Sequence, residues 1–153
     1  MENQNTISVL NDLIDDCFDS ERGFQEAADN ATDTSLKNFL GEASRERGRY
    51  TLSLLREVRS LGGGYGGRGS TGAAFHRLWM NIIGTLSGSD DQKLLAEADR
   101  GEDSLLKSYE EALRKGLPSH IESLLEAQSA SIKRRHELIK NMRAAAKCAC
   151  AGR

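Results

Sequence analysis

A charged side chain occupies the middle of an apolar helical stripe in residues 94–116, "LLAEADRGEDSLLKSYEEALRKG". The stripe includes Leu95, Leu105 and Tyr109, and the position that completes its spacing is Glu102. A buried carboxylate is unfavourable unless a cation, a metal ion or hydrogen-bond donors compensate its charge. Glu102 therefore predicts either an ion-paired core or a metal site.

Polar residues interrupt the apolar stripes of the other predicted long helices in the same way. Side chains three and four residues apart share one face of a helix, so each interruption can be placed on a face. When the helices are aligned through their short connecting turns, the interruptions fall within about one helical turn of the same height. The predicted buried polar layer consists of Glu21, Arg47, Glu102, Gln128 and Arg135.

One interpretation of this layer is an ion-paired network. The layer contains two carboxylates, two guanidinium groups and one amide. The planar guanidinium has five N–H donors, so one arginine can hold two carboxylates at once. We favour this interpretation, because Arg47 and Arg135 would repel a bound metal cation.

The alternative interpretation is a site for iron or manganese. Ferritin-like di-metal proteins supply a Glu from each of two helices and a Glu-x-x-His pair from each of the other two. Here an arginine, and not a histidine, stands three residues after Glu42 and three after Glu46. We therefore expect no cofactor and keep iron or manganese as the alternative. The candidate ligands for that alternative are Glu21, Glu42, Glu46 and Glu102.

A third hypothesis is a small-ligand pocket beside the segment "HRLW", residues 76–79. His76 and Trp79 are the candidate lining residues, although Trp79 could simply pack on the long helices while His76 makes a surface hydrogen bond. No Ser/His/Asp or Cys/His arrangement has a recognisable catalytic setting, so we do not expect an enzyme.

The cysteines favour a reducing compartment. Cys17 lies on an apolar stripe and is expected to be a small core residue. Cys148 and Cys150 form a C-x-C pair in a segment expected to fray, without further ligands for a soft metal. Three cysteines make no disulfide framework and the N-terminus has no basic, apolar signal, so we expect a cytoplasmic protein. His136 stands among basic residues and is expected at a boundary or in solvent.

Composition excludes two classes of partner. The formal net charge is −2, from 21 basic and 23 acidic residues mixed along the 153-residue chain, so no nucleic-acid footprint is expected. No apolar run approaches the roughly 18 residues of a membrane span, so no membrane partner is expected. One proline and few aromatic residues favour an all-α domain.

Apolar residues at helical spacing predict four long helices. They cover residues 6–30, 34–61, about 89–116, and about 118–142 or beyond. The expected N-terminal caps are Asn5 or Thr6 for the first helix, Asp33 for the second, and Ser89 paired with Gln92 for the third.

The connection between the second and third long helices is much longer than the other two. It comprises a glycine-rich connector, "GGGYGGRGS" at residues 62–70, and a short crossover helix at about 71–87. Two antiparallel hairpins joined by a long crossover are the layout of a ferritin-like four-helix bundle. We predict one domain over residues 1–147 and a short cysteine-containing tail at 148–153.

The chain resembles a bacterial family of ferritin-like four-helix-bundle proteins of uncharacterised function. The more specific segments of the likeness are "ADRGEDSLLKSYEEAL", residues 98–113, and "HRLW" in the crossover; "TISVLNDLI" and "ERGFQEAA" add to it. The resemblance implies the same fold and brings no established activity, substrate or cofactor. We expect a non-catalytic structural, interaction or stress-associated protein that forms a homo-oligomer or binds a protein partner.

Overall fold

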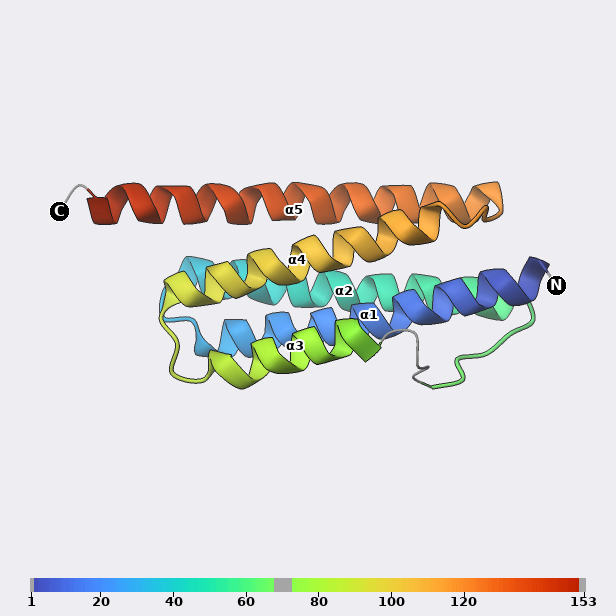
Figure 1. Cartoon of the computed structure of the whole chain (residues 1–153), viewed down its shortest axis with the longest axis horizontal. Helices are drawn as coiled ribbons and strands as arrows, with labels where there is room; N and C mark the ends of the chain where they lie inside the picture. The colour runs from blue at the N-terminus through green and yellow to red at the C-terminus, as the bar shows by residue number, and fades with distance from the viewer. Residues whose placement is uncertain (1, 68–72, 152–153) are drawn as a thin grey trace.

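The computed structural model describes residues 2–67 and 73–151 (Figure 1). The described residues form five helices and no strand, which confirms the all-α prediction. In chain order these are α1 Glu2–Asn30, α2 Thr34–Ser60, α3 Ala73–Leu86, α4 Asp91–Leu113 and α5 Ser119–Ala151.

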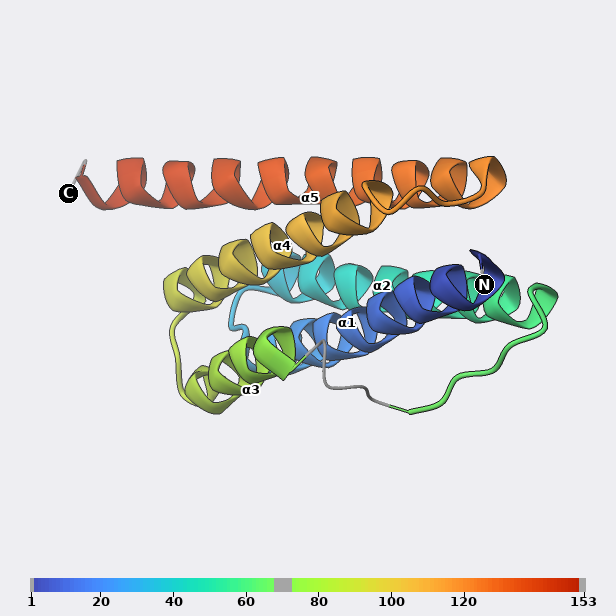
Figure 2. The same cartoon turned by 45° about the vertical axis from the view of Figure 1, so that its right-hand side comes forward.

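Four long helices lie side by side, and the short α3 packs beside them. Short turns join α1 to α2 and α4 to α5, and each of these pairs runs antiparallel (Figures 1 and 2). Because the chain returns along the assembly through the connection that contains α3, α2 and α4 run in the same direction (Figure 1). α1 contacts α2, α3 and α4, while α5 packs mainly on α4 and also reaches α2.

The core is formed by the apolar stripes that face inward from all five helices. Aliphatic side chains with no exposed surface come from each long helix; they include Leu10, Ile14, Leu40, Leu54, Leu94, Leu105, Ile121, Leu125, Ile132 and Ile139. Burial of such side chains is the main stabilising contribution in a helical domain of this size.

Trp79 attaches α3 to two of the long helices. Its side chain is 1% exposed, and its ring lies against Gly23 of α1 and Gly101 of α4. A Cβ atom added at Gly23 would lie 1.9 Å from the indole, and one at Gly101 would lie 2.3 Å from it. Only glycine at both positions leaves room for the ring where it lies.

Several helix boundaries differ from the sequence expectations. α1 already begins at Glu2, so neither Asn5 nor Thr6 is its cap. Asp33 caps α2 as expected, since its Oδ2 accepts a hydrogen bond from the backbone N–H of Leu36 at 2.9 Å. The cap of α4 is Asp90, whose Oδ1 accepts from the N–H of Lys93 at 2.8 Å, while the Ser89 hydroxyl donates back to the preceding turn.

The crossover and the C-terminal segment also differ in detail from the expectations. The crossover helix begins at residue 73, and of the connector 62–70 only residues 62–67 lie in the described part of the chain, outside any helix. Residues 148–151 of the predicted tail continue α5, and residues 152–153 lie outside the described part. None of the described helices combines the length and the apolar character needed to cross a membrane.

Candidate functional site

Arg47 lies at the centre of a buried ionic network. Its side chain and that of Glu102 have no exposed surface. The Nη2 group of Arg47 donates to Oε1 of Glu102 on α4, and Nη1 donates to Oε1 of Glu46, its neighbour on α2. The Nε group donates to the hydroxyl of Ser20 on α1 at 3.2 Å. One guanidinium therefore joins α1, α2 and α4.

Arg135 extends the network to α5. Its Nε and Nη2 groups each lie 3.4 Å from a carboxylate oxygen of Glu46. The charges alternate in sign along the order Glu102, Arg47, Glu46, Arg135, so every neighbouring pair attracts.

Aromatic rings close around the two guanidinium groups. The Cζ of Arg47 lies 5.4 Å from the ring centroid of Phe24 and 5.6 Å from that of Tyr50. The Cζ of Arg135 lies 5.0 Å from the ring centroid of Phe39. Rings at these distances attract a cation through their quadrupole and keep water away from it.

The pKa shifts of the network show a competition between burial and ion pairing. Burial raises the pKa of Glu102, and the Arg47 guanidinium offsets part of that effect. Burial also acts on Glu46, but Arg47 and Arg135 together hold the pKa of this carboxyl below its ordinary value. Burial opposes the charge on Arg47, yet Glu102 and Glu46 raise its pKa. The guanidinium is therefore a permanent cation.

Gln128 belongs to a second polar contact, on the Tyr109 side of the core. The hydroxyl of Tyr109 donates to Oε1 of Gln128 at 2.7 Å, and the sulfur of Cys17 lies 3.4 Å from the same hydroxyl oxygen. Burial raises the pKa of Tyr109 well above its ordinary value and that of the Cys17 thiol to about 12. Cys17 is thus an inert, buried thiol at neutral pH.

Glu21 lies outside the network, which corrects its assignment to the buried layer. Its side chain is half-buried, and a Cβ atom at Gly48 of α2 would lie 3.1 Å from its Oε1. The missing side chain at Gly48 lets the carboxylate rest on α2 without turning inward to Arg47. Ser20, one residue earlier, takes the contact with Arg47 instead.

The four carboxylates named as possible metal ligands do not come together. Arg47 stands between Glu46 and Glu102, Glu21 lies elsewhere, and Glu42 is exposed and paired with Arg45 at 2.8 Å. Within residues 2–67 and 73–151 no group of three or more His, Cys, Asp or Glu side chains is arranged to hold a metal ion.

His76 and Trp79 do not share a pocket. His76 Nδ1 lies 2.9 Å from Oδ1 of Asp19, and its ring borders a shallow hollow over α1 and α2. Trp79 is buried against Gly23 of α1 and Gly101 of α4 and does not line that hollow, and its Nε1 has no hydrogen-bond partner in the described part of the chain.

His136 is buried, which corrects its expected place at the boundary or in solvent. It is 5% exposed, and its Nε2 lies 2.6 Å from Oδ1 of Asp99 on α4. Arg143, two turns further along α5, donates to the other oxygen of Asp99. The neighbouring positive charge that suggested solvent is therefore matched by a carboxylate on the adjoining helix.

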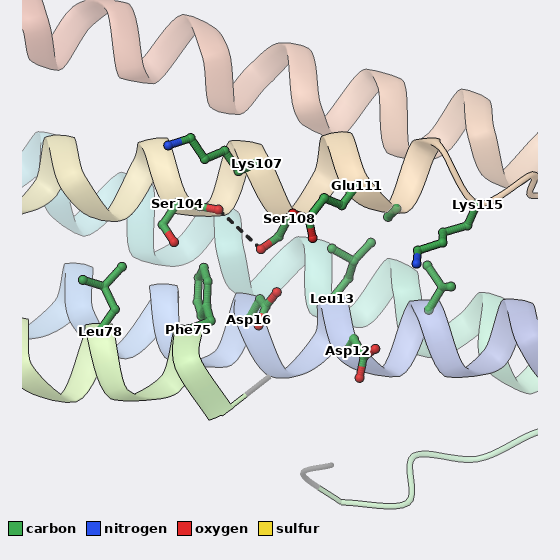
Figure 3. Close-up of a pocket in the computed structure, with 12 residues that line it drawn as sticks. Asp12, Leu13, Asp16, Phe75, Leu78, Ser104, Lys107, Ser108, Glu111 and Lys115 are labelled. Carbon is green, nitrogen blue, oxygen red and sulfur yellow. Dashed lines mark hydrogen bonds between the residues drawn. The ribbon is translucent and has the colours of Figure 1, made fainter. Parts of the chain in front are cut away.

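A cavity of about 430 Å³ lies between α1, α3 and α4 (Figure 3). Its lining includes Asp12 and Asp16 of α1, Phe75 and Leu78 of α3, and Ser108 of α4. Sequence reasoning missed this cavity. The available signal was the spacing of four aspartates, which places one acidic stripe on α1: Asp12, Asp15, Asp16 and Asp19.

Comparison with known proteins gives a family and no activity. A search of curated proteins finds no match. A family model described as "Domain of unknown function (DUF2383)" matches residues 5–115, which include α2, α3, α4 and nearly all of α1. This match covers more than half of the 153 residues. The chain therefore belongs to the DUF2383 family, a domain of unknown function.

Proposed function

We propose that this protein is a non-catalytic, ferritin-like four-helix-bundle protein of the bacterial cytoplasm, with a structural, interaction or stress-associated role. The arrangement of α1, α2, α4 and α5 around a long crossover supports the ferritin-like fold. Di-metal members of that fold class hold their metal ions with core side chains of facing helices, and in this chain an ionic network joins facing helices in the core.

The position of Arg47 carries this proposal. Its guanidinium has no exposed surface and bridges Glu46 and Glu102, the two candidate ligands nearest the centre. A permanent cation at that position repels a divalent ion and occupies carboxylate oxygens that a metal would need. The network fixes the helices relative to one another, because each charge would be stranded if its partner moved away.

Metal content tests the proposal against the iron or manganese alternative. The protein is purified without a metal-binding tag, its bound metals are measured, and ferrous iron is then added in air-saturated buffer, where dioxygen is the oxidant. We expect metal far below one ion per chain and no iron oxidation beyond that of buffer. Stoichiometric iron that disappears in Glu102→Ala, but persists in the exposed control Glu126→Ala, would overturn the proposal.

A double-mutant cycle tests the structural role of the ion pair directly. Arg47→Ala and Glu102→Ala should each lower the free energy of unfolding by about 3–5 kcal/mol, because each leaves a buried charge without its partner. The double variant should be no less stable than the worse single variant. Urea unfolding followed by circular dichroism measures all four proteins, and additive losses would contradict the pairing.

The partner in this proposal is a second copy of the chain or another protein. Light scattering coupled to gel filtration gives the molar mass in solution, which distinguishes a homo-oligomer from a monomer that needs a different partner. A monomeric result at micromolar concentration would leave only the second kind of partner.

A further inference from the structure

Asp16 is buried in the wall of the cavity between α1, α3 and α4 (Figure 3). It is 6% exposed, and Ser108 of α4 lies beside it and acts to lower its pKa, while the Ser108 hydroxyl donates to the backbone carbonyl of Ser104 at 3.3 Å. The Oδ1 atom of Asp16 has no hydrogen-bond partner in the part of the chain that the structure describes. A buried acceptor without a donor is unfavourable, so this oxygen is ready to accept a hydrogen bond from a ligand.

Negative charge predominates in the cavity. Asp12 and Glu111 also line it, and Asp12 lies one turn from Asp16 on α1. Of the two lining lysines, Lys107 is mostly exposed and its Nζ lies 2.9 Å from Oδ2 of Asp103. Lys115 is exposed at the rim of the cavity. Burial and Asp15 raise the pKa of Asp12, and Lys115 offsets only part of that increase. The deepest charged group is therefore a carboxylate.

The remaining wall is apolar. Val9 and Leu13 of α1 and Phe75 and Leu78 of α3 border the space beside Asp16. A volume of about 430 Å³ lies within the range of small-molecule sites, which combine apolar walls with few orienting polar groups. These walls suit a hydrocarbon body better than a hydrated inorganic ion, and no described group of acidic side chains here has the arrangement of a metal site.

We propose that this cavity binds a small organic ammonium ion, whose N–H group donates to Oδ1 of Asp16 and whose hydrocarbon part lies against Phe75 and Leu78. The site is separate from the ionic network around Arg47. It does not depend on the proposed structural role of that network, and either can fail while the other holds.

The binding should strengthen as the pH rises toward neutrality. Burial, together with Asp19, Asp12 and Asp15, raises the pKa of Asp16 to about 7, so the empty site is largely protonated in acid. An ammonium ion binds the ionised carboxylate, and affinity should fall about tenfold for each pH unit below that pKa. On α1 the charged neighbours of Asp16 are Asp12, Asp15 and Asp19, and His76 of α3 is bound to Asp19. On α4 they are Lys107, Glu111 and Lys115. Phe75 and Leu78 of α3, which also line the cavity, carry no charge.

Titration with benzylammonium chloride at pH 8 tests the proposal, with benzyl alcohol and benzoate as neutral and anionic probes of similar shape. Calorimetry measures binding, and Trp79 fluorescence gives a second signal, because Phe75 in the cavity wall lies 6.4 Å from the Trp79 ring. We expect saturable binding of the cation, and at least about tenfold weaker binding of the other two probes. Equal binding of the alcohol, stronger binding of benzoate, or no saturation would overturn the proposal.

Two variants locate the binding at Asp16. Asp16→Asn should weaken benzylammonium binding at least about tenfold and remove its pH dependence, while the exposed control Asp29→Asn on the same helix should leave both unchanged. Leu78→Trp places bulk in the cavity and should reduce binding with Asp16 intact. It also serves as an independent test if Asp16→Asn fails to give the native circular dichroism spectrum. Unchanged benzylammonium binding in a correctly folded Asp16→Asn or Leu78→Trp variant would contradict the proposal.

Discussion

Arg47 shows how a charged residue can be a core residue. Its three nitrogen atoms donate to Ser20, Glu46 and Glu102, and the rings of Phe24 and Tyr50 lie beside its Cζ. A guanidinium in this setting loses its hydration shell but keeps its hydrogen bonds. Its burial is therefore tolerable only while all of the acceptors around it are present.

Glycine at position 101 is expected to be essential for packing. Gly101→Ala would place a Cβ atom 2.3 Å from the Trp79 ring, and both sides of that contact are buried. We expect a loss of about 1–3 kcal/mol in the free energy of unfolding, although alanine is the better helix former. Urea denaturation measures the change.

Gly84 on α3 provides the matched control for that substitution. A Cβ atom there meets nothing within 4 Å, so Gly84→Ala should stabilise the protein by up to about 1 kcal/mol through helix propensity alone. If both substitutions stabilise the protein equally, the indole does not lie where the structure places it.

Some of the network residues were accessible from the sequence and others were not. Arg47 and Glu102 stand on apolar stripes, and helical periodicity identifies such interruptions directly. Glu46 is off the stripe, so its role as the link between Arg47 and Arg135 depends on side-chain contacts that no periodicity describes. Glu21 is on the stripe, but its side chain rests on the bare backbone at Gly48.

At the scale of elements, α5 has two kinds of attachment. Its first half buries Ile121, Leu125 and Ile132, mainly on α4. Its second half has Ile139 in the core and Met142 packed against the core, and Asp99 of α4 pairs with its His136 and Arg143. The second half therefore depends more strongly on charge.

Asp99→Asn is expected to loosen the second half of α5 selectively. Hydrogen exchange followed by mass spectrometry should show faster exchange in residues 136–147 and unchanged exchange in residues 121–132. Asp103→Asn is the control on the same helix, since Asp103 pairs with Lys107 and not with α5. Equal protection of residues 136–147 in both variants would contradict the role of Asp99.

The same attachment should weaken in acid. Burial opposes the charge of Asp99, but His136 and Arg143 hold its pKa below the ordinary value. A carboxyl whose pKa is lower in the folded than in the unfolded state stabilises the folded protein at pH values above its unfolded pKa of about 3.9. This stabilisation is lost as the pH falls from there through the folded pKa. In the unmodified protein, exchange of residues 136–147 should therefore rise below about pH 4.

Helix boundaries were the least predictable feature of the elements. Ser89 and Asp90 are both good caps, and the choice between them depends on where the backbone turns. The end of α5 lies beyond Met142 because the alanine-rich segment that follows retains helix propensity and contains no breaker before Gly152. The ion pair of Arg143 with Asp99 of α4 also supports the segment just beyond Met142.

At the scale of the whole molecule, the family match and the folded unit have different limits. The match ends at residue 115, whereas α5 begins at Ser119. Yet α5 places four aliphatic side chains with no exposed surface in the core, namely Ile121, Leu125, Ile132 and Ile139. It also supplies Gln128 to Tyr109 and Arg135 to Glu46. The folded unit therefore includes α5.

A chain that ends at Leu117 should consequently fail to fold as a cooperative unit. Burial of four aliphatic side chains contributes roughly 6–12 kcal/mol, which is comparable with the whole stability of a typical domain. Thermal unfolding followed by circular dichroism should show a sharp transition for the full chain and none for residues 1–117. A chain of residues 1–147 is the matched control and should unfold like the full chain, because Cys148 is exposed and the removed segment adds no residue to the described core. A sharp transition of residues 1–117 near the temperature of the full chain would mean that α1–α4 are stable alone, and that α5 is an attachment to a complete core.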